Sequence, residues 1–184
     1  GYTKIQRIIS HLRMKTPLSA LIKIVVEWYQ LHAGIQESTL KFTDRIGYVH
    51  CPWIGEVREF MRKTKTHMVC PSLWTPKPQR EGDECIMNKL RGKTGLKLER
   101  VNSVRLYHKV LYVSDITSMD GKTIINEQPG TTRELLGRSS SLPWPEQQKP
   151  GPRAYREWTK ALKMISSETL QLKAPLGKWF EDLD

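Results

Sequence analysis

The chain has 184 residues, and its 30 Lys and Arg against 19 Asp and Glu give a formal net charge of +11. This length is enough for one domain with a sizeable core or for one domain with an appendage, and hydrophobic residues make up 38% of the sequence. No run approaches the roughly 20 apolar residues that a membrane-spanning helix needs, so no membrane partner is expected. A balance this basic favours a polyanionic ligand, and nucleic acid is the first candidate. The alternative is a basic protein whose charge does not bind a ligand.

The cysteines indicate the compartment. Cys51, Cys70 and Cys85 are odd in number and show no paired spacing, which favours a reducing, intracellular location, nuclear or cytoplasmic, over a disulfide framework. No signal-peptide pattern opens the chain. The chain begins with Gly1 rather than Met, which leaves open that it is a piece of a longer protein.

Two helices are expected at the start. Residues 2–13 place Ile and Leu at helical spacing, with a basic stripe of Lys4, Arg7, His11 and Lys15 about 100° around the helix. Thr16 is the predicted N-cap of a second helix, Pro17 its first residue, and Gly34 its stop. This second helix is apolar on most of its circumference, which predicts that it is deeply buried.

A weaker helix is expected over 38–47 and a stronger one from Cys51 onward. The stronger helix has an apolar face that includes Trp53 and Phe60. Its opposite face mixes both signs of charge, which indicates a solvated face rather than a basic stripe. The residues of that face are Glu56, Arg58, Glu59, Arg62 and Lys63.

The stretch 96–115 is predicted to be the central helix of the fold. Its polar residues Asn102, Arg105 and Lys109 fall on one narrow stripe, and Val and Leu cover most of the rest, as in a helix buried on several sides. A strand is the alternative, because β-formers crowd 104–113. The length favours a helix, since about eighteen unbroken residues exceed an ordinary strand.

The remaining third of the chain is more varied. A small β-hairpin is expected over 116–125, with Asp120-Gly121 as its turn, followed by a linker rich in Gly, Ser and Pro over 126–151. A last helix starts at Pro152, and Pro175-Leu176-Gly177 suggests a turn that folds back. The predicted fold is therefore mainly α, a multi-helix domain around a buried central helix with a small β-hairpin. The predicted organisation is a helical core domain over 1–125, the linker, and a C-terminal helix and turn over 152–184.

No motif in the sequence supports catalysis or a cofactor. Gly-Lys-Thr occurs at 92–94 and 121–123, but neither copy has the preceding glycine of a phosphate-binding P-loop. Tyr112-Val113-Ser114-Asp115 is similar to the Tyr-x-Asp-Asp motif of reverse transcriptases, yet Ser114 replaces the first carboxylate of a two-metal site. A zinc site is not expected either, because adjacent His50-Cys51 is poor ligand spacing. The other two candidate zinc ligands would be His67 and Cys70.

The basic stripes are the strongest functional signal. In the last helix, Tyr155, Trp158 and Leu162 form an apolar face, opposite a basic one suited to phosphate contacts. A charge stripe is often only a solvated face, but two stripes in a chain already skewed positive favour phosphate binding. The predicted nucleic-acid-binding residues are Lys4, Arg7, Lys15, Arg153, Arg156, Lys160 and Lys163.

The order of several short motifs resembles an uncharacterised region of retroelement open reading frames, which lies between the reverse transcriptase and an RNase H-like domain. The resemblance runs from about Gly34 onward. The motifs are Trp53-Ile54, Val57-Arg58 and Phe60; Trp74-Thr75-Pro76; Asp83 with Ile86-Met87; Val101-Asn102-x-Val104-Arg105-Leu106-Tyr107; Ser114-Asp115-Ile116 with Asp120-Gly121; Trp144-Pro145; Trp158 with Ala161-Leu162; and Pro175-Leu176-Gly177-x-Trp179.

The resemblance implies a connecting or thumb-like domain to which no catalytic residue carries over. It also implies adjacent polymerase and RNase H domains if the chain is a fragment. The expected function is a non-catalytic domain that grips RNA or an RNA/DNA duplex, without metal or cofactor. The alternative is a protein–protein interaction module with no nucleic-acid ligand.

Overall fold

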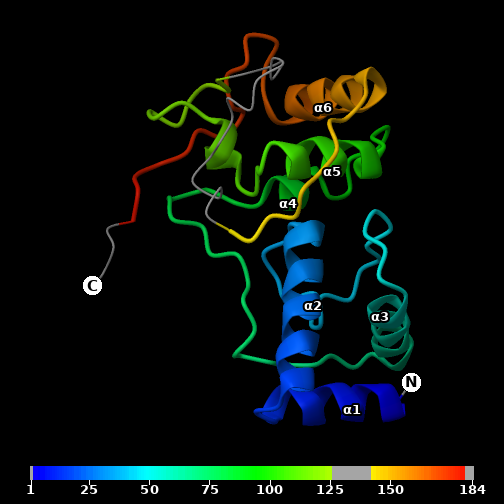
Figure 1. Ribbon diagram of the computed structural model, residues 1–184. Coiled ribbons are helices and arrows are strands. Elements are labelled where there is room, and N and C mark those ends of the chain that lie inside the picture. Colours follow the sequence, from blue (N-terminus) through cyan, green and yellow to red (C-terminus); the bar gives the residue numbers. More distant parts are fainter. Residues whose placement is uncertain (1, 126–141, 181–184) are drawn as a thin grey trace. The chain divides into compact units, whose positions relative to one another are not determined.

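The computed structural model describes residues 2–125 and 142–180, and within them the chain is mainly helical, as expected (Figure 1). The chain divides into two compact units: the N-terminal unit, Gly1–Pro76, and the C-terminal unit, Lys77–Asp184. None of the helices in the described part combines the length and apolar character needed to cross a membrane. They are α1 (Tyr2–Arg13), α2 (Pro17–Ala33), α3 (Pro52–Thr64), α4 (Ile86–Leu90), α5 (Leu98–Tyr107), the 3-10 helix η1 (Val113–Ile116) and α6 (Pro152–Ile165).

These units differ from the expected organisation. The stretch 1–125, expected to be one domain, is divided after Pro76, and α6 packs on α5 within the C-terminal unit. Of the expected linker, residues 126–141 lie outside the described part, and residues 142–151 contain no helix or strand. The ring of Trp144 lies near the guanidinium of Arg105, with 5.7 Å between the ring centre and the guanidinium carbon, so this segment is held near residue 105 within the C-terminal unit.

In the N-terminal unit, α1 lies across the start of α2 (Figure 1) and contacts both α2 and α3. The apolar stripe of α1, with Ile8 buried, faces the core of this unit, as its helical spacing predicted. The other buried core residues are Val26, Tyr29, Leu40, Ile54, Val57, Met61, Met68 and Leu73.

The ends of α2 are those that the sequence predicted. Thr16 is the N-cap and forms a capping box with Ser19, Pro17 opens the first turn, and Gly34 ends the helix in the left-handed region with φ 59°. The expected deep burial is found mainly towards the end of the helix, where Val26 and every residue from Tyr29 to Ala33 are buried. The first half leaves large apolar side chains in solvent: Leu18, Leu21 and Ile24 are 51%, 57% and 61% exposed.

The helix expected over 38–47 is not formed; turns and bends occupy that segment. The side chain of Gln30, which is buried, donates to the carbonyls of Ile35 (2.7 Å) and Glu37 (3.1 Å) and accepts the Thr39 N–H (2.7 Å). One amide side chain therefore satisfies three backbone groups of the connection.

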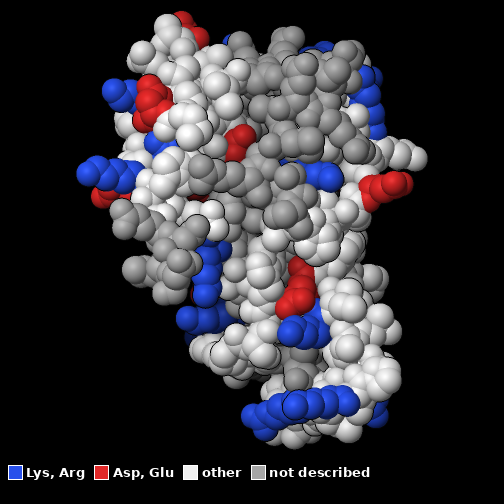
Figure 2. Space-filling model, turned by 60° about the vertical axis from the view of Figure 1, so that its left-hand side comes forward, with Lys and Arg blue, Asp and Glu red and all other residues white. Residues whose placement is uncertain are grey.

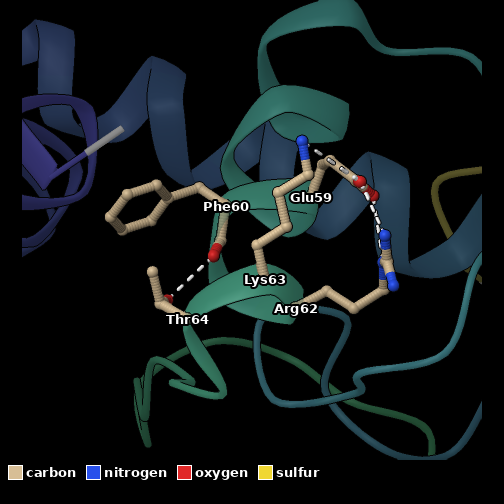
Figure 3. A network of polar contacts seen from close by, with 5 residues as sticks. All are labelled: Glu59, Phe60, Arg62, Lys63 and Thr64. Carbon is tan, nitrogen blue, oxygen red and sulfur yellow. Dashed lines mark hydrogen bonds and ion pairs between the residues drawn. The ribbon is translucent and has the colours of Figure 1, made fainter.

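The charged face of α3 is solvated except at one position. Glu59 accepts two hydrogen bonds from Arg62, at 3.0 and 2.7 Å, and lies 3.8 Å from Lys63 (Figure 3). Arg58, expected on the same face, is only 7% exposed. Its guanidinium donates to the carbonyls of Thr39 and Asp44, so it ties the preceding loop to α3 instead of facing solvent.

In the C-terminal unit, the central helix is much shorter than predicted. α5 covers Leu98–Tyr107, and the rest of 96–115 forms a left-handed turn at Lys109 (φ 57°), an extended piece and η1. The Val110 N–H bonds to the Arg105 carbonyl at 2.9 Å and the Lys109 N–H to the Leu106 carbonyl at 3.2 Å, the pattern of a Schellman helix end.

The expected polar stripe of α5 is mostly buried as well. Arg105 has no exposed surface, and it donates to Asn102 Oδ1 (2.8 Å) and to the Val110 carbonyl (3.1 Å). This second bond draws the chain back after Tyr107. Arg105, which the helical spacing placed on a polar stripe, thus stabilises the turn that ends the helix.

The expected hairpin over 116–125 is not a pair of strands. The chain does reverse there, with Gly121 at φ 76°, but only one antiparallel bridge joins Thr117 and Ile124. Other backbone groups of this loop bond to the C-terminal segment, where Gln171 bridges Thr123 and the Leu176 N–H donates to the Gly121 carbonyl at 2.9 Å. The end of the chain folds back, as Pro175-Leu176-Gly177 predicted, and Trp179 bridges Arg80.

Candidate nucleic-acid interface

The helix α6 is strongly two-sided. Gly151 precedes it, Pro152 occupies its first turn, and its apolar side packs on α5. Trp158 and Leu162 have no exposed surface, and Ala154, Ala161 and Ile165 are also buried. Because the buried side is large and aromatic, the opposite side is held facing solvent.

That outer side carries all four predicted basic residues of α6. Arg153, Arg156, Lys160 and Lys163 recur at helical spacing and are exposed. Only Lys160 forms an ion pair within the described residues, with Glu157 at 2.9 Å. The structure therefore brings these four side chains together on one helix face, here called the α6 basic face.

Glu157 lies at the edge of the α6 basic face but points into the protein. It is 6% exposed, and it accepts the backbone N–H of Lys97 at 3.0 Å as well as the Lys160 ammonium. These two hydrogen bonds, the backbone bond first, hold the pKa of Glu157 below its usual value. The carboxylate joins α6 to the start of α5, so it adds little negative charge to the surface.

The same contact adds basic residues beside the α6 basic face. Lys97 precedes α5 and donates its backbone N–H to Glu157, and the charge of Arg100, in the first turn of α5, lowers the pKa of that carboxylate. Neither residue could be assigned to the interface from the sequence, because both are far from α6 in the chain. Their basic character was visible, but only their contacts with Glu157 place them next to α6.

The predicted stripe on α1 belongs to the N-terminal unit and is weaker. Lys4 is paired with Glu56 on α3, so its charge is partly offset. Arg7 and Lys15 are exposed. Figure 2 shows Lys and Arg side chains on one face of the molecule, with Asp and Glu side chains beside some of them.

Three arginines are withdrawn from the surface altogether. Arg58 and Arg105 are described above; the third, Arg80, is 4% exposed and donates to the carbonyls of Gly177 (2.6 Å) and Met119 (3.0 Å). Its guanidinium also lies over the Trp179 ring, 4.7 Å from the ring centre. These side chains stabilise turns, so the charge available to a ligand is smaller than composition suggests.

The motifs considered for catalysis have structural roles. Asp115, in the segment similar to a polymerase motif, is 6% exposed and accepts the N–H groups of Leu111 (2.7 Å) and Tyr112 (2.9 Å). Among the described residues, no group of three or more His, Cys, Asp or Glu is arranged to hold a metal ion. The cysteines are free thiols. No protein-family model, curated protein or solved structure matches this chain.

Proposed function

We propose that this chain is a non-catalytic nucleic-acid-binding domain that contacts the phosphates of RNA or of an RNA/DNA duplex through the α6 basic face. The observation that carries the proposal is the exposure of Arg153, Arg156 and Lys163 on one helix face, without an ion pair in the described residues. Phosphate contacts of this kind are independent of sequence and dominate the affinity of basic domains for nucleic acid. Lys97 and Arg100 widen the basic area next to α6, and Arg7 and Lys15 offer further contacts from the N-terminal unit.

The resemblance to retroelement open reading frames supports a more specific placement. In that placement, the chain is a connecting or thumb-like domain of an intracellular polyprotein, between a polymerase domain and an RNase H-like domain. Its role is to hold template and primer, and the chemistry belongs to its neighbours.

The proposal is tested by the salt dependence of binding. Each phosphate contact releases counterions, so the log–log slope of affinity against salt falls by roughly 0.9 per contact on duplex DNA. Replacing Arg156 and Lys163 by Gln should make the slope shallower by about one to two units, without changing sequence preference. The matched control replaces Lys122 and Lys178, which are exposed basic residues outside α6, and should keep the wild-type slope. Equal slopes for both double variants would refute the proposal.

A protein–protein interaction module is the second candidate function. The observation that favours it is the exposed apolar side of α2, with Leu18, Leu21 and Ile24. Under this alternative, the chain has no salt-dependent affinity for nucleic acid at all, which the same titration of the wild-type protein would show.

A further inference from the structure

The loop that joins α4 to α5 is basic and exposed to solvent. Every residue from 91 to 95 is exposed, and this stretch contains Arg91 and Lys93 but no acidic residue. Lys93 forms no ion pair within the described residues. The Gly-Lys-Thr at 92–94 lies in this loop and is not a P-loop, so its exposed charge is available to a different ligand.

The end of the loop is fixed against α6 by a single carboxylate. The backbone N–H of Lys97 donates to Glu157 Oε2 at 3.0 Å, and Glu157 Oε1 accepts the Lys160 ammonium at 2.9 Å. The charge of Arg100, in the first turn of α5, lowers the pKa of the same carboxylate. Glu157 therefore holds Lys97 and Arg100 beside the α6 basic face.

The tip of the loop leaves room for a ligand close to the backbone. Gly92 and Gly95 have φ of 75° and 81°, and a Cβ added at either position would meet no atom within 4 Å. Glycine at such positions lets another molecule approach the main chain closely.

The cations of this region form two neighbouring rows. One row is the α6 basic face. The other, here called the α5 row, consists of Lys93 and Lys97, which are exposed, and Arg100, which is partly exposed. Glu99 is the one acidic residue in the sequence 91–100, so the α5 row keeps a net positive charge.

The expected distance between the two rows is that of a nucleic-acid groove. The helices α5 and α6 pack on each other, and packed helices have axes about 8–10 Å apart. The grooves of B-DNA are about 6 and 12 Å wide. Two rows of cations at this spacing can each contact one of the two phosphate backbones that border a groove.

The aromatic residues of α6 are not part of this surface. Trp158 has no exposed surface, and the hydroxyl of Tyr155 is hydrogen-bonded to His108 at 3.0 Å. Proteins that bind single strands combine cations with aromatic side chains on which the bases stack. Because the α6 basic face offers cations without aromatic side chains, it is suited to phosphates rather than to unpaired bases.

We propose that the α6 basic face and the α5 row bind the two strands of one duplex, so that each row contacts the phosphates of one strand across a groove. This inference rests on the function proposed above and narrows its ligand to double-stranded nucleic acid. In this arrangement, Lys93 and Lys97 contact phosphates of a strand that is absent when a single strand occupies the α6 basic face.

The test measures the salt dependence of binding of the whole chain to an RNA/DNA duplex and to its RNA strand alone. Lys93→Gln/Lys97→Gln should make the slope on the duplex shallower by about one to two units, because each contact accounts for roughly 0.9. The slope on the single strand should stay at the wild-type value. Arg156→Gln/Lys163→Gln should make both slopes shallower.

A charge-preserving variant is the matched control. Lys93→Arg/Lys97→Arg keeps both cations and should keep both wild-type slopes, since the slope counts neutralised phosphates. All these positions are exposed, so each variant should melt near the wild-type temperature. Equal changes of slope in the Gln and Arg variants would contradict the proposed role of the two charges.

The outcomes separate this inference from the proposed function. A wild-type duplex slope in Lys93→Gln/Lys97→Gln, together with a shallower slope in the α6 variant, would overturn the two-strand arrangement and leave the proposed function standing. An equal loss on the duplex and on the single strand would also overturn it, because the α5 row would then extend the path of one strand. Binding by the wild type that does not depend on salt would refute the proposed function itself.

Discussion

His108 is a buried imidazole whose burial couples folding to pH. It is 1% exposed, and its Nε2 shares a hydrogen bond with the hydroxyl of Tyr155 at 3.0 Å. Tyr107 and Tyr155 both contact the ring edge-on. Desolvation lowers the pKa of His108 from its ordinary 6.5 to about 4, so the folded protein keeps the ring neutral.

The direction of the resulting pH dependence follows from the number of protons that His108 binds in the folded and unfolded states. Between pH 6.5 and about 4, the unfolded chain protonates His108 and the folded chain does not. The stability due to the neutral ring is complete above pH 6.5 and falls as the pH falls towards 4, by on the order of 3 kcal/mol. Replacing His108 by Gln should remove this part of the slope in urea unfolding at a series of pH values. His50→Gln, at an exposed position, should leave the slope intact; an unchanged slope in His108→Gln would contradict the assignment.

Gly121 is a position that only glycine can occupy without strain. Its φ is 76°, and an added Cβ would lie 2.5 Å from the Leu176 carbonyl oxygen and overlap the Arg80 guanidinium. Gly121→Ala is expected to lower the free energy of unfolding by about 3 kcal/mol, from backbone strain and overpacking together. Gly92 has φ 75° but open space around it, so Gly92→Ala should cost only about 1 kcal/mol. Equal losses in the two variants, measured by denaturant unfolding, would show that the Gly121 contacts contribute nothing.

At the scale of elements, the pairing of α5 with α6 is the centre of the C-terminal unit. Val101, Val104 and Val110 have no exposed surface, and neither has Trp158 on α6. The turn at Lys109 brings Val110 back into the same core immediately after α5 ends. The core therefore depends on the turn as much as on the helix.

Val110→Asp is expected to unfold the C-terminal unit, because an unpaired buried carboxylate costs several kcal/mol. The adjacent Lys109→Asp is the control. Position 109 is only partly buried, and Asp tolerates the left-handed backbone there, so this variant should melt cooperatively near the wild-type temperature. Cooperative melting of Val110→Asp at the wild-type temperature would show that this core is not essential.

At the scale of the whole molecule, the division into two units predicts how the three thiols react. Cys51 and Cys70 of the N-terminal unit are partly exposed, whereas Cys85 of the C-terminal unit is buried. Burial raises the pKa of the Cys85 thiol, which further suppresses its reactive thiolate.

A thiol reagent should therefore label Cys51 and Cys70 in the native protein and leave Cys85 protected. Mass spectrometry should find labelled Cys85 in Val110→Asp, while the labelling rates of Cys51 and Cys70 stay at their native values. Cys85→Ser identifies the protected site in the spectrum. Simultaneous acceleration at all three thiols in Val110→Asp would show that the two units unfold as one.

Capping residues and apolar spacing in the sequence determined the features of helices that depend only on residues near in the chain. Thr16, Pro17 and Gly34 set the ends of α2 by capping and backbone preference, which need no distant partner. The spacing of Trp158 and Leu162 likewise predicted the buried side of α6 and, with it, the exposed position of its four basic residues. The helical character of the fold and the main part of the candidate interface were therefore predictable.

Tertiary contacts determined the features that the spacing of apolar and charged residues could not predict. Arg58 and Arg105 have the composition of surface residues, but each is buried because it satisfies backbone carbonyls that its own helix cannot reach. The loop expected to be a hairpin forms only one bridge within itself, and other backbone groups of the loop bond to the distant C-terminal segment. Lys97 and Arg100 joined the α6 basic face only through Glu157. A periodic pattern records which residues share a side of a helix, and it contains no information about which distant carbonyl or carboxylate will lie against that side.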